Sequence, residues 1–195
     1  MKRTIILSLL CLFAAWTLTA QNTDSIPKTR SHYTLAIGAG WSHYFSNMDL
    51  VPARNVQKEF IGTSFRFMWE PEYRLSLGLE TGFYRIFRVD SVLTTEYTMD
   101  ARMYVVPLLL VIRMRIANNF YLSVAPGLAM QFSTINGIGD KIQSHQLSLA
   151  NFEACASYLY PLNKHCEVGG EAKFFYIGKT NDYIMSLNAV FAVKL

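Results

Sequence analysis

A two-residue alternation of apolar and polar or small residues recurs from residue 33 to the end of the chain. In residues 60–70 the odd positions hold Ile, Thr, Phe, Phe and Trp, and most even positions hold small or charged residues. Because successive side chains of a strand point to opposite faces, this pattern predicts strands with one apolar face. Eight segments show it, and no helical periodicity follows residue 21: 33–45, 60–70, 73–90, 102–116, 120–133, 146–162, 166–177 and 182–195.

The predicted connections between these segments alternate in length. Short turns are expected near residues 71–72, 117–119 and 162–164. Longer loops are expected at 46–59, 91–101 and 134–145, with a shorter connection near 179–181. Short turns at one end and long loops at the other are typical of outer-membrane barrels. An even number of strands would then place both termini on the short-turn, periplasmic side.

Alternation alone also fits a soluble sandwich, so the choice depends on what each face carries. The polar face is rich in Gly, Ala and Ser, which suit the crowded interior of a narrow barrel. The longest apolar run after the N-terminus is the eight-residue Val105–Ile112, whereas a membrane helix needs roughly 20 apolar residues. We therefore predict an all-β, eight-stranded, antiparallel up-and-down transmembrane barrel. A periplasmic sandwich is the alternative.

Aromatic residues at the ends of the apolar faces predict two interfacial girdles in a membrane. The short-turn end has Trp69, Tyr73, Phe120 and Tyr160. The long-loop end has Trp41, Phe83, Tyr104, Phe132 and Tyr176.

The N-terminus has the pattern of a cleaved signal peptide. Lys2 and Arg3 precede an apolar stretch over residues 5–15, and Ala20 offers a cleavage site. We expect a signal peptide at 1–20, a flexible leader at 21–31 and an outer-membrane barrel at 32–195. Lipidation at Cys11 is not expected, because Cys11 lies within the apolar stretch after Leu10. Cleavage would lower the formal charge from +4 to +2, too weak to indicate nucleic-acid binding.

Charged residues on the polar face are expected to point into the barrel. Buried charges need partners, so we predict a salt-bridged plug, with an ion path as the alternative. In particular, Arg113 and Arg115 are expected to face Glu153, Glu167 and Glu171 across the lumen, and Glu153 to pair with Lys173. The predicted inward set is Arg66, Glu70, Arg74, Glu80, Arg113, Arg115, Glu153, Glu167, Glu171 and Lys173.

No catalytic, cofactor or metal motif emerges from the sequence. The four histidines have no metal-ligand spacing and are expected at the surface. His145 and Ser148 could belong to a lipid-A esterase site, but the nearest acid, Glu153, is expected to point inward. The glycine-rich residues 137–141 lack the strand-to-helix context of a phosphate loop. Cys155 is expected to face inward and Cys166 outward, so no disulfide is expected between them.

Two stretches carry a family resemblance. Met103–Leu110, followed by a basic strand end and tight turn, and Phe120–Gly127 resemble the centre of the outer membrane β-barrel domain family of Bacteroidota, which includes PorT-like proteins. Val111 and Ala125 depart from that pattern, where Lys and Gly are usual. The resemblance implies an eight-stranded barrel and little about activity.

These features together predict a small non-enzymatic outer-membrane protein. Its expected role is loop-mediated binding of a protein or glycan, or an envelope- or secretion-associated structural role. The expected partners also include membrane lipid and, during insertion, the barrel-assembly machinery, for which the C-terminal strand resembles a signal. The alternative is an enzyme that modifies lipids at the outer leaflet.

Overall fold

The structure is a computed structural model that describes residues 31–45, 56–71, 74–94, 97–136 and 141–195. The predicted signal peptide, most of the predicted leader and Tyr73 lie outside the described residues.

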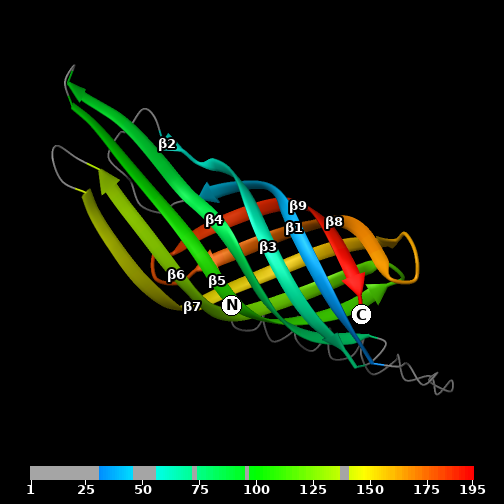
Figure 1. Cartoon of the computed structure of the whole chain (residues 1–195). Coiled ribbons are helices and arrows are strands. Elements are labelled where there is room, and N and C mark those ends of the chain that lie inside the picture. Colours follow the sequence, from blue (N-terminus) through cyan, green and yellow to red (C-terminus); the bar gives the residue numbers. More distant parts are fainter. Residues whose placement is uncertain (1–30, 46–55, 72–73, 95–96, 137–140) are drawn as a thin grey trace, which may run out of the picture.

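Eight long strands form a closed antiparallel barrel (Figure 1). Each strand pairs with the next along the chain, and β9 returns to pair with β1, so the sheet closes. The two-residue β2 (Val56–Gln57) pairs with β4 at Arg88 and Val89, past the end of the β3–β4 ladder. The predicted all-β, eight-stranded architecture is confirmed. The eight strands are β1 (His32–Phe45), β3 (Glu59–Glu70), β4 (Leu75–Thr94), β5 (Tyr97–Ala117), β6 (Phe120–Asn136), β7 (Lys141–Pro161), β8 (Cys166–Ile177) and β9 (Asp182–Lys194).

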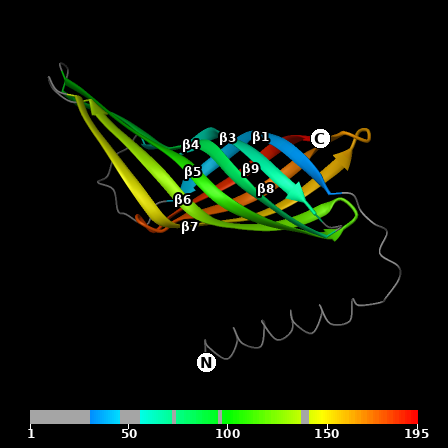
Figure 2. The ribbon, with the colours of Figure 1, turned by 60° about the horizontal axis from the view of Figure 1, so that its bottom comes forward.

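Two hairpins extend well beyond the other strands at one end of the barrel. The β4–β5 ladder continues to Thr94–Tyr97, and the β6–β7 ladder to Asn136–Lys141. Figures 1 and 2 show both hairpins projecting together from that end. The prediction of long loops at 91–101 and 134–145 is therefore wrong. Backbone pairing continues there, although both segments lack the regular apolar alternation that marks a strand in the sequence.

Burial alternates along the strands in step with the two faces. In β3, Ile61, Phe65 and Trp69 are exposed, whereas Ser64 and Arg66 are buried. This alternation separates an outer wall of exposed apolar residues from an interior of polar and charged residues. The register changes once between β6 and β7, where Gly127 pairs with Asn151 but Ala129 pairs with Ser148.

The barrel interior also contains an apolar core that the sequence pattern did not predict. Tyr84, Ile86, Leu109, Phe175 and Ile184 are almost fully buried and form one packed cluster. Most of these residues lie toward the extended hairpins. They occupy inward-facing positions, so the interior-facing set is not uniformly polar.

Candidate functional site

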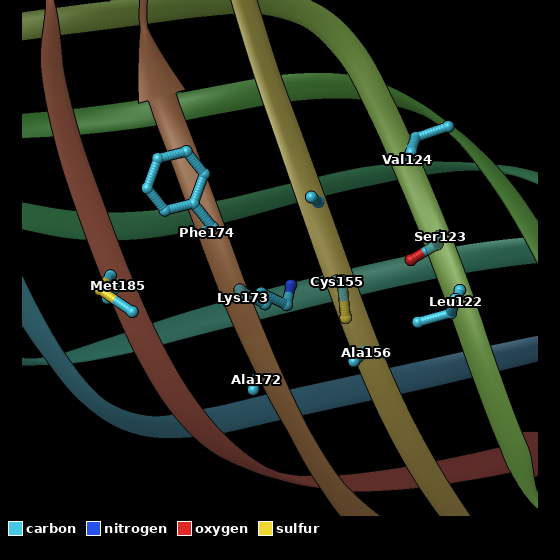
Figure 3. Close-up of a pocket in the computed structure, with 10 residues that line it drawn as sticks. Leu122, Ser123, Val124, Cys155, Ala156, Ala172, Lys173, Phe174 and Met185 are labelled. Carbon is cyan, nitrogen blue, oxygen red and sulfur yellow. The ribbon is translucent and has the colours of Figure 1, made fainter. Parts of the chain in front are cut away.

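The centre of the barrel holds a cluster of ion pairs around Lys173. The Lys173 Nζ atom lies 3.2 Å from Glu171 Oε1 and 3.4 Å from Glu153 Oε1, and it also contacts Glu80. These four side chains come from β4, β7 and β8 and are all buried. Figure 3 shows Lys173 on the inner side of the wall, beside Cys155, its register partner. One ammonium group thus joins strands on opposite parts of the ring.

Arg66 completes this central cluster from β3. Its Nε lies 2.6 Å from Glu80 Oε2, and its Nη2 lies 3.1 Å from Glu171 Oε2. Glu80 and Glu171 therefore each bridge Arg66 and Lys173. Asn188 Nδ2 donates a further hydrogen bond to Glu171 over 3.2 Å. Buried charges of this kind must be paired, because their desolvation is costly.

A second charged group lies nearer the short-turn end and is centred on Glu70. Glu70 Oε1 accepts hydrogen bonds from Arg113 Nη2 at 2.5 Å and Thr34 Oγ1 at 2.8 Å, and Glu70 Oε2 lies 3.2 Å from His32 Nε2. The Arg113 guanidinium lies 4.7 Å from the centre of the Tyr121 ring. At the same end, Lys194 forms an ion pair with Glu167.

The structure brings together, in one cluster, five of the ten charged residues of the predicted inward set. Arg66, Glu80, Glu153, Glu171 and Lys173 form the central cluster. Arg113 pairs with Glu70 rather than with Glu153 or Glu171, so this part of the expected arrangement across the lumen is wrong. Barrel strands are tilted and staggered, so residues at similar distances from their turns can lie at different heights.

The two remaining arginines of the inward set sit closer to the barrel end. Arg115 is half-buried over the ring of Tyr121, with 5.2 Å between its guanidinium carbon and the ring centre. Arg74 is exposed, which contradicts its expected inward orientation. It precedes the first residue of β4, so the alternation of the strand does not yet control it.

The aromatic residues expected in the girdles lie on the outer wall wherever the structure describes them. Exposed members are Trp41, Trp69, Phe83, Phe120 and Tyr160, and half-buried ones are Tyr104, Phe132 and Tyr176. Their assignment to membrane interfaces stays a prediction.

His145 and Ser148, the residues considered for an esterase site, do not converge. His145 is exposed and packs edge-on against Phe132, with 5.2 Å between the ring centres. Ser148 is buried, and its Oγ donates a hydrogen bond to Asn151 Oδ1 over 2.9 Å. Within the described ranges, no group of three or more His, Cys, Asp or Glu side chains is arranged to hold a metal ion. Cys155 and Cys166 are both free thiols.

The outer wall carries a shallow apolar hollow of about 380 Å³ across β6, β7, β8 and β9 (Figure 3). Its floor has the small residues Ala154, Ala156 and Ala172, and larger residues such as Leu122 and Phe174 surround them. The hollow follows from residue size on adjacent strands, and its lining offers little polar chemistry.

The comparisons with known proteins match this chain in fold, through solved structures, and not in sequence family. No family model matches the chain, so the resemblance to PorT-like proteins is not confirmed, and no curated protein matches it either. No helix among the described residues is long and apolar enough to cross a membrane.

Several solved outer-membrane proteins share the architecture of this chain. Ail, the attachment invasion locus protein of Yersinia pestis, solved in complex with the heparin analogue sucrose octasulfate, aligns with a TM-score of 0.57 at 11% identity, covering 86% of this chain and all of that one. A major outer membrane protein from Thermus thermophilus gives 0.52 at 12% identity, and Neisserial surface protein A gives 0.50 at 14%, with the same coverage. The chain thus has the fold of small outer-membrane β-barrels.

Proposed function

We propose that this chain is an outer-membrane barrel whose lumen is filled by side chains and whose projecting hairpins bind a partner. The proposal includes export through a signal peptide at 1–20 and a location in the outer membrane with both termini periplasmic. Exposed apolar residues on strands all around the ring support membrane insertion. Soluble monomers rarely expose an apolar patch of more than a few hundred Å².

The observation that carries the proposal is the filling of the lumen. The central ion pairs connect β3, β4, β7 and β8 across the barrel, and the apolar cluster around Tyr84 and Phe175 packs beside them. Eight strands leave an interior just wide enough for side chains, whereas water-filled porins have about twice as many. A chain of this kind is not suited to steady ion conduction.

With the lumen filled, the parts available to a partner are the projecting β4–β5 and β6–β7 hairpins and the outer wall. Near its tip the β6–β7 hairpin exposes polar residues such as Gln143 and Ser144, which suits a protein or glycan partner. Ail, which shares the fold, was solved with a sulfated sugar bound. A binding role of this kind fits a non-enzymatic protein of the envelope, including one associated with secretion.

Two measurements test the proposal. The chain should fractionate with outer membrane and migrate differently in gels with and without boiling, and purified protein should give no steady current in a planar bilayer. Recovery in the soluble periplasmic fraction would contradict membrane insertion. Stable ion-selective channels that change when Glu171 or Arg113 is neutralised would contradict the filled lumen.

Surface binding is tested by shortening one hairpin. Replacing residues 92–98 by an Asn-Gly turn, which favours tight hairpins, removes the tip of β4–β5 and leaves the barrel intact. We expect a protein or glycan that binds the native chain to bind this variant at least tenfold more weakly. Binding equal to that of the native chain would remove the β4–β5 hairpin from the proposal.

A further inference from the structure

The β3–β4 pairing stops partway up the barrel wall. The ladder runs from Trp69–Leu77 to Thr63–Phe83, although β3 continues to Glu59 and β4 to Thr94. On its other edge, β3 stays paired with β1 as far as His43–Glu59. The two strands therefore separate over residues 59–62 and 84–87, and β4 is next paired on that side by β2.

The gap between β3 and β4, called the seam below, lies beside a β-bulge and is covered on its inner side by one aromatic side chain. The β4–β5 register shifts between Arg85 and Phe87, which marks a β-bulge at Ile86. Bulges occur at barrel rims and next to binding sites, where they redirect side chains. From inside, the buried ring of Tyr84 packs against the wall: a Cβ at Gly62 would lie only 2.9 Å from Tyr84 Cδ1. The seam is thus closed toward the lumen and open toward the outer wall.

Arg85 occupies the gap between β3 and β4, where its guanidinium lies between two aromatic rings. Its guanidinium carbon lies 5.6 Å from the ring centre of Phe60 and 5.6 Å from that of Tyr104. No carboxylate contacts it within the part of the chain that the structure describes. Two aromatic rings hold the guanidinium in place, but they do not use its N–H donors. A guanidinium whose donors meet no carboxylate among the described residues suits a phosphate, which it can bind through two parallel hydrogen bonds.

A pocket of about 490 Å³ opens in front of Arg85. Trp41, Ile61 and Phe83 form its apolar lining, and Gln57 and Glu59 add polar groups. The Glu59 carboxylate lies 3.6 Å from His43 Nδ1. The pocket therefore joins an apolar outer wall to the cationic Arg85, the amide of Gln57 and the carboxylate of Glu59, which lies beside His43. A membrane lipid likewise presents apolar chains next to a charged headgroup.

We propose that this pocket binds the phosphate-bearing headgroup of a membrane lipid. The lipid phosphate accepts hydrogen bonds from Arg85, and the start of the acyl chains lies against Trp41 and Phe83. The separation of β3 and β4 requires the pocket to lie at the level of the lipid headgroups, because backbone groups without ladder partners need water or polar groups around them. The inference rests on the proposed membrane location and adds a lipid site to it.

Native mass spectrometry of the purified full chain tests the proposal. The protein is released from micelles doped with phosphatidylglycerol, phosphatidylethanolamine or diacylglycerol, and retained lipid is counted. We expect one phospholipid to be retained and diacylglycerol to be lost, because only the phospholipids carry phosphate. R85Q should weaken retention about ten- to hundredfold, the range for a hydrogen bond to a charged group. R74Q, which removes an exposed arginine at the opposite end, is the matched control.

Equal retention of diacylglycerol, or equal loss of lipid in R74Q and R85Q, would overturn the proposal. Displacement of the lipid by millimolar inorganic phosphate would also overturn it, because it would indicate a site for free phosphate. The comparison of phospholipid with diacylglycerol uses the native chain, so it holds even if R85Q does not fold. Heat-modifiable migration and insertion into vesicles are measured on the same samples. Insertion without lipid retention contradicts only this site, whereas failure to insert contradicts the membrane location.

Discussion

The two halves of the barrel interior are filled by different means. The half from the barrel centre to the short turns holds ion pairs such as Arg66–Glu171, together with a smaller apolar cluster that includes Leu159. The half toward the hairpins is filled mainly by apolar side chains such as Tyr84 and Phe175. Both fillings block the lumen, but their energetics differ. Breaking a buried ion pair leaves an uncompensated charge, whereas truncating an apolar side chain leaves a cavity. The difference can be measured by unfolding variants of each half in the same micelles.

The largest effect is expected in the charged half, at Lys173. We expect K173M to lower the free energy of unfolding by about 3–5 kcal/mol, because three carboxylates then lose their shared cation. Denaturant titration followed by gel migration measures the loss. Adding E153Q should restore part of it by removing one of the stranded charges. A neutral K173M variant would show that water already screens the cluster.

A smaller loss is expected in the apolar half, at Leu109. This side chain is fully buried among the apolar residues of the lumen. L109A should lower the free energy of unfolding by about 2–4 kcal/mol through lost burial and the cavity left behind. The same denaturant titration applies, with L110A on the outer wall as the control. Equal losses in the two variants would argue against a packed apolar lumen.

A hydrogen bond at the short-turn end should contribute less than either of these. Thr34 Oγ1 donates to Glu70 Oε1, which also accepts from Arg113. T34V preserves the shape and removes the donor, so we expect a loss of about 1.5 kcal/mol, within the range for hydrogen bonds to charged groups. The double variant T34V/E70Q should lose less than the sum of the single variants. Additive losses would mean that the two side chains do not interact.

The smallest effect is expected outside the lumen, at Arg74. This residue is exposed at the barrel end. R74Q should change the free energy of unfolding by no more than about 0.5 kcal/mol, as for most surface substitutions. A loss as large as that in K173M would show that Arg74 enters the charged half after all.

The sequence by itself determined the number of strands and the face on which most residues lie. Strand alternation is a local property of the backbone, so the sequence pattern alone assigns Arg66, Glu153 and Lys173 to the interior face. It also locates the short turns, because the alternation stops at them. The apolar filling was missed because inward position was equated with polar character, although Tyr84 and Phe175 also occupy inward positions.

Only the tertiary structure decided which inward residues meet. Ring closure and the stagger between strands set the heights at which side chains face each other, and neither is encoded in one strand. This is why Lys173 reaches Glu80 across the barrel and Arg113 reaches Glu70. The hairpin lengths and the seam beside Arg85 likewise depend on backbone pairing between strands, which leaves no apolar pattern in the sequence of either strand.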